Sequence, residues 1–204
     1  MGFTLKSFIQ ERGGIDAPQI GHQKYEQVGF GTPTGKIELY STIMEDLGYD
    51  PLPKYEEPPQ ALVSSPRMAK DFPMIVISHR NRDLYQSQGR QIKAVRRKSP
   101  DPIAQLNARK ATELGIEDGD WIWVETPIGR ARFKCQHFSG VDPRVVSTEF
   151  GWWLPEKPAE EPSLHGAWES NINAILDEGP DLRDPMTGAW VLRGVMCKVS
   201  KADN

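Results

Sequence analysis

Apolar residues along this chain gather in short runs of strand length, and nearly all of these runs lie after residue 70. The first is Phe72–Ser78, whose β-branched content predicts a strand buried on both faces. Ile103–Leu106 predicts a second strand. Asn107 then predicts the start of a helix over Ala108–Leu114, which Gly115 closes.

Positions that alternate between apolar and polar residues predict the rest of a sheet. A turn at Glu117–Asp120 leads into one strand, and Pro127–Gly129 turns the chain back into the next, as in a half-exposed antiparallel pair. The strands predicted after the helix are Trp121–Glu125, Arg130–Gln136, Arg144–Phe150 and Arg193–Val199. Five or more short strands with one small helix indicate a mainly β fold with short helices, closed into a β-barrel.

The first seventy residues have a different pattern, with seven prolines and a single clearly periodic strand, Lys36–Tyr40. A short helix is predicted over Ser41–Leu47, with Gly48 closing it, and an extended connector stiffened by prolines follows. Such a segment buries too little apolar surface to offset the entropy lost when it becomes ordered. We therefore expect residues 1–70 to lie on something larger and residues 71–204 to form the compact domain.

Composition and charge narrow the classes of function. The chain of 204 residues has a formal net charge of -3, which argues against a protein built wholly to bind nucleic acid or an anionic membrane. No apolar run is long enough to predict direct membrane insertion, and no targeting signal indicates a compartment. Cys135 and Cys197 match no metal-ligand spacing, and a nucleophile elbow, a P-loop and the dinucleotide glycine pattern are all absent. The sequence therefore favours binding over catalysis.

A basic stretch follows the first predicted strand. Between residues 80 and 98, seven basic side chains accompany one acid, Asp83, in an otherwise acidic protein. Side-chain donors lie among them, notably Ser78, His79 and Gln86–Gln88. Guanidinium groups bind phosphate oxygens through paired hydrogen bonds, and hydroxyl and backbone N–H groups fill the remaining positions. The stretch is a candidate phosphate or pyrophosphate site, and the alternatives are a solvated basic loop and a nucleic-acid contact.

Two further segments carry residues suited to a flat heterocycle. Glu149–Leu154 contains adjacent tryptophans, which point to opposite sides at a strand end, so that one of them is free to line a groove. Packing in the core is the alternative for this pair. Asn171 and Asn173 place two amides on one side of an extended segment, where they suit a purine edge, and the alternative is that they cap a turn.

Taken in order, these motifs resemble the C-terminal region of the dimethyl sulfoxide reductase family of molybdopterin oxidoreductases. The resemblance covers nearly the whole chain and is closest to the thiosulfate reductase, polysulfide reductase and acetylene hydratase-like branch. It rests on Gly29–Ser41, Gly48–Pro58, Ser87–Gln91, Asn107–Gly129, Gly151–Trp153, Glu169–Asn173 and Cys197–Val199.

The resemblance implies a six-stranded double-psi β-barrel whose loops reach over a bis-molybdopterin guanine dinucleotide cofactor with molybdenum or tungsten. It implies that the donor-rich loop contacts phosphates, ribose and the pterin edge, that the aromatic turn flanks a pterin or guanine, and that the asparagines hydrogen-bond this group. The cofactor-binding residues implied in this way are Ser78, His79, Arg80, Gln86, Ser87, Gln88, Arg90, Phe150, Gly151, Trp152, Asn171 and Asn173.

The resemblance also implies that the redox chemistry occurs elsewhere. Family members carry an iron–sulfur cysteine cluster and a metal ligand in earlier domains, so no metal ligand and no catalytic residue is expected in this sequence. The expected partners are the remaining domains of a catalytic subunit or a separately encoded larger subunit, and an iron–sulfur electron-transfer subunit is a further candidate. The alternative is a stand-alone nucleotide- or cofactor-binding barrel with a cofactor-handling or regulatory role.

Overall fold

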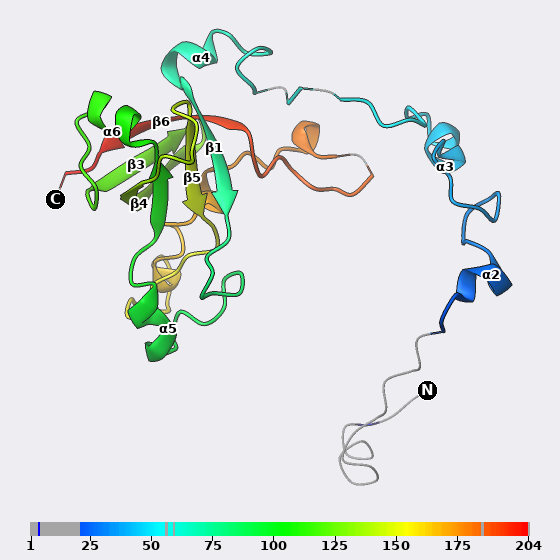
Figure 1. Ribbon diagram of the computed structural model, residues 1–204, viewed down its shortest axis with the longest axis horizontal. Coiled ribbons are helices and arrows are strands. Elements are labelled where there is room, and N and C mark those ends of the chain that lie inside the picture. The colour runs from blue at the N-terminus through cyan, green and yellow to red at the C-terminus, as the bar shows by residue number, and fades with distance from the viewer. Residues whose placement is uncertain (1–3, 5–20, 56, 59, 185, 204) are drawn as a thin grey trace. The chain divides into compact units, whose positions relative to one another are not determined.

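The computed structural model describes residues 4, 21–55, 57–58, 60–184 and 186–203, and it contains a closed barrel of six short strands. The order of strands around the barrel is β1-β5-β2-β4-β3-β6 (Figure 1). β1 and β5 pair in parallel, as do β2 and β4, and every other neighbouring pair is antiparallel. The strands are β1 (Met74–His79), β2 (Ile103–Leu106), β3 (Trp121–Thr126), β4 (Gly129–His137), β5 (Val145–Glu149) and β6 (Val195–Lys201).

The chain divides into two compact units, residues 1–55 and 56–204, and the barrel belongs to the second. The first unit contains the helices α2 (Lys24–Val28) and α3 (Thr42–Asp46). The second contains α4 (Met68–Asp71), α5 (Lys93–Lys98) and α6 (Ala108–Glu113), with the 3-10 turns η1 (Leu164–Gly166), η2 (Ile172–Ile175) and η3 (Pro180–Leu182).

Alternating side chains fill the barrel because successive residues of a strand point to opposite faces. The interior contains fully buried residues such as Leu106, Ile122, Phe133 and Val146. The β3–β4 hairpin pairs from Trp121↔Lys134 to Thr126↔Gly129, which confirms the predicted antiparallel pair. The six-stranded β-barrel with few short helices is confirmed as a whole.

Local signals predicted the helix ends well. Ser41 accepts a hydrogen bond from the Met44 backbone N–H at the start of α3, and Gly48 follows the helix with a positive φ of 80°. Asn107 accepts from the Arg109 backbone N–H at the start of α6. Both predicted helices are confirmed, because polar side chains at these positions satisfy N–H groups that lack partners within the helix.

Several predictions of local structure were wrong. Residues 36–40 form no strand, because the Glu38 carboxylate accepts hydrogen bonds from Thr34 and Thr42 and holds the segment in turns. β1 is fully buried on one face only, since Ile75 and Ile77 are half-buried on the other. The basic stretch after β1, predicted as a loop, contains the short helix α5 (Lys93–Lys98).

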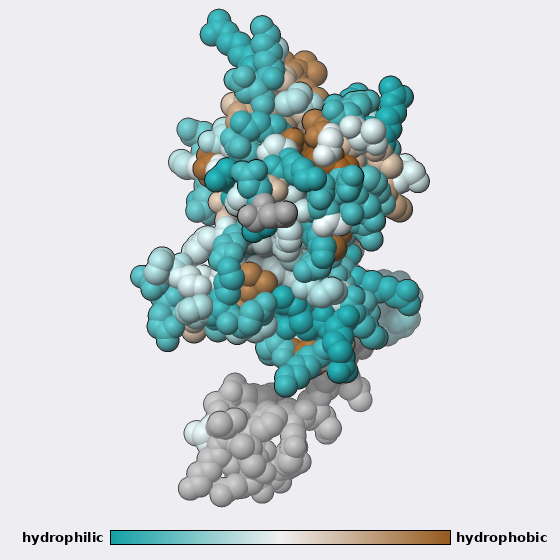
Figure 2. Space-filling model, turned by 90° about the vertical axis from the view of Figure 1, so that its left-hand side faces the viewer, coloured by the Kyte–Doolittle hydropathy of each residue, from teal (hydrophilic) through white to brown (hydrophobic). Residues whose placement is uncertain are grey.

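The surface of the barrel unit is mainly polar. On the side that carries α6 and the carboxyl terminus, Figure 2 shows hydrophilic residues interrupted by small hydrophobic patches. Within the described residues, no helix is both long and apolar enough to cross a membrane.

Candidate functional site

Parallel pairing of β1 with β5 brings the two segments of greatest chemical interest to one end of the barrel. The register runs from Ile75↔Val145 to His79↔Glu149, so both strands end side by side. The connections that leave this end are residues 80–102 and 150–194. In Figure 1, α5 lies at this end of the barrel and α6 at the opposite end.

Direct hydrogen bonds join the loop after β1 to the turn after β5. The Trp153 indole Nε1–H donates to the Ser87 carbonyl at 2.6 Å. Gly151 has a φ of 63°, and a Cβ at this position would lie 3.2 Å from the Ser87 Cβ. Glycine therefore meets both requirements here, the left-handed backbone and the close approach of the two loops.

Arg90 is buried between the two loops, with 1% of its surface exposed. Its Nη1 donates to the Gln86 carbonyl at 3.0 Å and its Nη2 to the Phe150 carbonyl at 3.4 Å. The guanidinium also stacks on the buried Trp152 ring, 4.6 Å from the centroid, and Arg96 lies 5.2 Å from the same ring. Burial lowers the pKa of Arg90, and the negative charge of Glu149 opposes that shift.

Glu149 is the acid whose negative charge acts on the buried Arg90 guanidinium. Its Oε1 accepts a hydrogen bond of 2.6 Å from the Asn81 amide. Burial raises the pKa of Glu149 to about 6, while the bonds from Asn81 and the charge of Arg90 act in the other direction. Its second oxygen, the Arg90 Nε and the Trp152 Nε1 are buried without a hydrogen-bond partner among the described residues.

The last residues of β1 are held within the strand layer. Ser78 is half-buried opposite Thr148. His79 is also half-buried, and its Nδ1 lies 2.9 Å from the Ser147 hydroxyl. Burial lowers the pKa of His79, so the neutral imidazole is favoured.

Beyond β1 the candidate donors face solvent. Arg80, Gln86, Ser87 and Gln88 are all exposed, and Gln86 has a left-handed φ of 55°. Within the part of the chain that the structure describes, the Arg80 side chain has no hydrogen bond or ion pair. The loop thus exposes the unpaired Arg80 guanidinium and several amide and hydroxyl groups to solvent. The buried Arg90 hydrogen-bonds the backbone of the same loop at the Gln86 carbonyl.

The asparagines occupy a turn, and the predicted extended segment was wrong. Asn171 begins the 3-10 turn η2, and its Oδ1 accepts from the Asn173 backbone N–H at 3.1 Å. The same oxygen accepts from the Gly151 N–H at 3.2 Å, which connects this turn to the aromatic segment. Asn173 itself is exposed. The capping role considered for the pair therefore applies to Asn171, because short amide side chains satisfy free N–H groups at the start of a turn.

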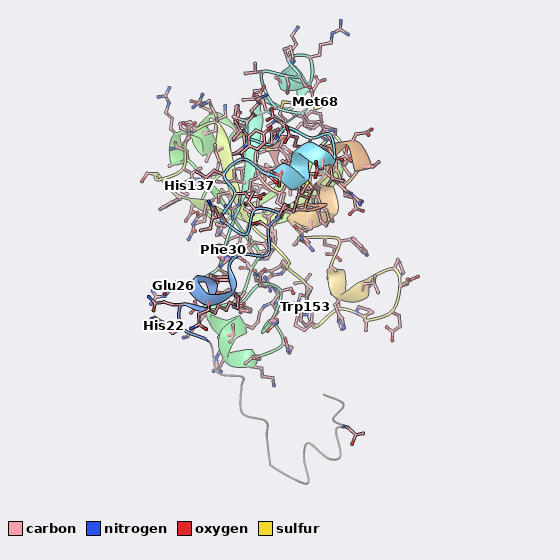
Figure 3. The ribbon with its side chains drawn as sticks, turned by 90° about the vertical axis from the view of Figure 1, so that its right-hand side faces the viewer. His22, Glu26, Phe30, Met68, His137 and Trp153 are labelled. Atoms are coloured by element: carbon pink, nitrogen blue, oxygen red, sulfur yellow. The ribbon has the colours of Figure 1, made fainter. Side chains whose placement is uncertain are left out.

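Ser87 and Trp153 line two hollows at this end of the barrel. One is lined by Ser87, Gly151, Trp153, Leu164, His165 and Asn171 among others. The other is lined by Asp83, Tyr85, Gln88, Gln91 and Ile92 together with Ser87 and Trp153. Figure 3 shows Trp153 among the loops below the barrel strands.

Some residues of this site were not selected from the sequence. Trp153 is half-buried and lines both hollows, whereas its neighbour Trp152 is fully buried. The alternation of strand neighbours predicted that one tryptophan would line a groove but could not decide which. No local signal marked Glu149 or His165, because their positions depend on packing between distant segments.

No protein metal site is evident at this end of the barrel. The described residues contain no group of three or more His, Cys, Asp or Glu side chains able to hold a metal ion. Cys135 and Cys197 are free and buried, and burial raises the pKa of the Cys135 thiol to about 11. Both thiols are therefore packed, protonated side chains.

The fold defines a six-stranded barrel domain with exposed donors in the loop after β1, and comparison with known proteins gives its family. The profile of the family described as Molydopterin dinucleotide binding domain matches residues 74–189. The chain belongs to this family, whose members occur in molybdenum oxidoreductases of the dimethyl sulfoxide reductase type. The expected cofactor, bis-molybdopterin guanine dinucleotide with molybdenum or tungsten, agrees with this membership.

Relatives in larger enzymes support the same assignment. Acetylene hydratase of Syntrophotalea acetylenica is 38% identical over 179 residues, which cover 86% of this chain and 24% of that protein. Dopamine dehydroxylase of Eggerthella lenta is 35% identical over 179 residues, covering 85% of this chain and 17% of that protein. The solved structure of acetylene hydratase from Pelobacter acetylenicus matches with a TM-score of 0.80 and 38% identity, over 86% of this chain and 24% of that one.

The chain thus spans about a quarter or less of the relatives it matches. The matched region is only a small part of each relative, and most of their sequence lies outside it. The exposed donors of the loop also fit the cofactor chemically, because phosphate oxygens need guanidinium, amide and hydroxyl donors. Arg80, Gln86, Ser87 and Gln88 offer such groups to solvent.

Proposed function

We propose that this chain grips the dinucleotide arms of bis-molybdopterin guanine dinucleotide within a larger molybdenum or tungsten oxidoreductase. The observation that carries the proposal is the joining of the loop after β1 to the turn after β5, through the Trp153–Ser87 and Arg90–Phe150 hydrogen bonds. These are the two segments that the family resemblance assigns to the cofactor, and they form one continuous binding edge.

In this proposal one group of residues contacts the cofactor and a second group supports the two loops. Arg80, Gln86, Ser87 and Gln88 are exposed and neutralise or hydrogen-bond the phosphate and ribose groups. The buried residues Arg90 and Trp152 and the partly buried Phe150 hold the backbone of both loops in place, together with Gly151 and Asn171. Ser78 and His79 anchor the end of β1. When bound, the cofactor supplies the metal and its electron or atom exchange, and the protein supplies orientation and charge.

The first seventy residues are proposed to lie on the rest of that oxidoreductase, either on domains of the same chain or on a separate larger subunit. Large apolar side chains are exposed along this segment, including Leu39 at 85% and Tyr55 at 87%. Their number in one segment supports a surface that another protein covers. An iron–sulfur electron-transfer subunit is a further proposed partner of the assembled enzyme.

The test is cofactor content in the complete oxidoreductase. Arg80→Ala removes an exposed guanidinium at the binding edge, and Arg109→Ala removes an exposed guanidinium on α6 at the opposite end of the barrel. The purified variants are assayed for molybdenum or tungsten and for guanine nucleotide released by acid hydrolysis. We expect Arg80→Ala to retain much less of both than Arg109→Ala, which should match the unmodified protein.

Equal cofactor content in both variants would contradict the proposed binding of the cofactor by the loop after β1. The same preparations distinguish the alternative of a stand-alone module, which requires the 204-residue chain alone to bind a guanine nucleotide with measurable affinity. Calorimetric titration of the chain with GMP tests that requirement directly.

A further inference from the structure

We infer that His165 is a ligand-contacting residue of the hollow beside Trp153, where its Nε2 accepts a hydrogen bond from an N–H on the edge of a bound fused-ring heterocycle. This inference rests on the proposed function and deepens it, because it names a residue and the kind of ligand edge that the residue meets. Neither the family resemblance nor the sequence patterns singled out His165.

His165 lies in the wall of the hollow beside Trp153. His165 lines the hollow together with Ser87, Gly151, Trp153 and Asn171. Its ring lies 5.5 Å from the Trp153 ring at a tilt of 57°, and Trp153 is itself fixed by its bond to Ser87. The imidazole therefore belongs to the same wall as the two segments assigned to the cofactor.

The orientation of the imidazole follows from one hydrogen bond. His165 Nδ1 lies 2.8 Å from the Lys157 carbonyl oxygen, and a carbonyl can only accept. Nδ1 therefore carries the proton, and in the neutral ring the lone pair is on Nε2. Among the described residues Nε2 has no hydrogen-bond partner, so it remains available as an acceptor.

The backbone holds this ring at a conformational cost. Leu164 and His165 have left-handed φ values of 44° and 55°, and Gly166 follows at 66°. Left-handed backbone costs roughly 1–2 kcal/mol for each residue with a side chain. The His165 N–H donates to the Pro158 carbonyl at 2.8 Å, and its carbonyl accepts from the Leu154 N–H at 2.7 Å. Such over-determined strain is characteristic of ligand-binding segments.

Asn171 completes the chemistry of the hollow. Both lone-pair positions of its Oδ1 are used, one by the Gly151 N–H and one by the Asn173 N–H. Its amide nitrogen is then the group left to meet a ligand, as a donor. An acceptor on His165 and a donor on Asn171, beside an aromatic wall, match a lactam edge in which a ring N–H adjoins a carbonyl. The pyrimidinone ring of a pterin and of guanine both carry that edge.

The experiment uses the complete oxidoreductase loaded with its cofactor. His165→Asn keeps a residue type that tolerates left-handed backbone, and its amide can still donate to Lys157, but it lacks a group at the position of Nε2. His165→Gln is the second variant, whose longer amide can place an oxygen acceptor near the position of Nε2. We expect His165→Asn to lose guanine nucleotide about tenfold faster in mild denaturant, the loss expected for one hydrogen bond, and His165→Gln to recover part of that loss. Arg109→Ala should release it at the unmodified rate.

Hydrogen exchange at the Leu154 and Gly166 amides separates a binding role from a structural one. In the cofactor-free chain we expect His165→Asn to leave that exchange unchanged. Faster exchange there would overturn the inference, because His165 would then only support its own loop. Unmodified release rates in both His165 variants, with Arg80→Ala still losing cofactor, would overturn the inference and leave the proposed function standing. Unmodified rates in Arg80→Ala as well would overturn both.

Discussion

At the scale of single residues, a carboxylate and a guanidinium of opposite charge are buried at the candidate binding edge. Glu149 and Arg90 are 3% and 1% exposed, and each leaves one buried atom without a partner. Moving charges out of water is costly unless partners compensate them closely. Glu149 and Arg90 should therefore affect the free energy of unfolding, which can be measured without any ligand.

The first prediction concerns pH. Burial raises the pKa of Glu149 from 4.5 to about 6. Below the lower value the carboxyl is protonated in both the folded and the unfolded chain. Above the higher value it is charged in both, and the folded chain bears the burial cost. The contribution of Glu149 to the free energy of unfolding should thus fall by roughly 2 kcal/mol as the pH rises through this window.

Glu149→Gln should abolish that contribution, since an amide does not titrate. Urea unfolding of both proteins at pH values on either side of the window gives the difference in unfolding free energy between them. That difference should change by roughly 2 kcal/mol from one side to the other. A difference independent of pH would show that the raised pKa is wrong.

The second prediction concerns Arg90, which bonds the Gln86 and Phe150 carbonyls and stacks on Trp152. Arg90→Met leaves both carbonyls and the Glu149 charge uncompensated, so the unfolding free energy should fall by about 3–5 kcal/mol. Arg90→Lys should recover only part of it, because an ammonium cannot reproduce the planar fork. Arg97→Ala, an exposed site on α5, should change it by less than about 0.5 kcal/mol. Equal effects at Arg90 and Arg97 would contradict the role of Arg90 as the link between the loops.

At the scale of elements, the sequence predicted what depends on neighbours in the chain. β2, α6 and the β3–β4 hairpin carry their own caps, turns and alternation, and each formed as expected. The strand predicted at residues 36–40 had the right alternation but no partner strand, and the Glu38 carboxylate formed turns instead. The Lys93–Lys98 helix was missed because its residues carry no apolar period.

The candidate site shows the same division. The donor-rich loop and the aromatic turn could be recognised as segments, since their residue types suit phosphate and a ring. Their contact depends on the parallel pairing of β1 with β5, which joins positions about seventy residues apart along the chain. Packing between distant segments also decides that Trp152 is buried and that His165 lies beside Trp153.

The third prediction tests the contact between these two elements. Trp153→Phe keeps an aromatic ring but removes the hydrogen bond to the Ser87 carbonyl. Losing about 1 kcal/mol should speed local opening of the loop roughly fivefold. Hydrogen exchange of the Gln88 and Ile92 amides, which close turns in this loop, measures the change. Trp168→Phe, at an exposed tryptophan, should leave both amides unaffected. Unchanged exchange in the first variant would mean that the loop holds its shape without Trp153.

At the scale of the whole molecule, the two units differ in how they treat apolar side chains. The barrel unit buries a continuous core, with residues such as Phe133 and Ile122 at 0% exposure. In the described part of the first unit, α2 and α3 have no buried residue, and Ile37, Leu39 and Leu47 are largely exposed. A segment of this composition gains little from folding on itself. The proposed covering surface on the rest of a larger oxidoreductase would supply the burial that this segment lacks.

The last prediction follows from that dependence. Leu39→Ser combined with Ile37→Ser should leave the unfolding free energy of the barrel unit within about 0.5 kcal/mol of its original value, because neither side chain is buried. The same change should lower the fraction of chain recovered with the remaining oxidoreductase domains, since each apolar side chain buried at an interface contributes about 1.5–3 kcal/mol. Ile128→Ser, at a residue of the barrel unit that is 51% exposed, is the matched control and should assemble normally. Normal recovery of the double variant would mean that these residues are ordinary surface, and a lower stability of the barrel unit would mean that they serve its own fold instead.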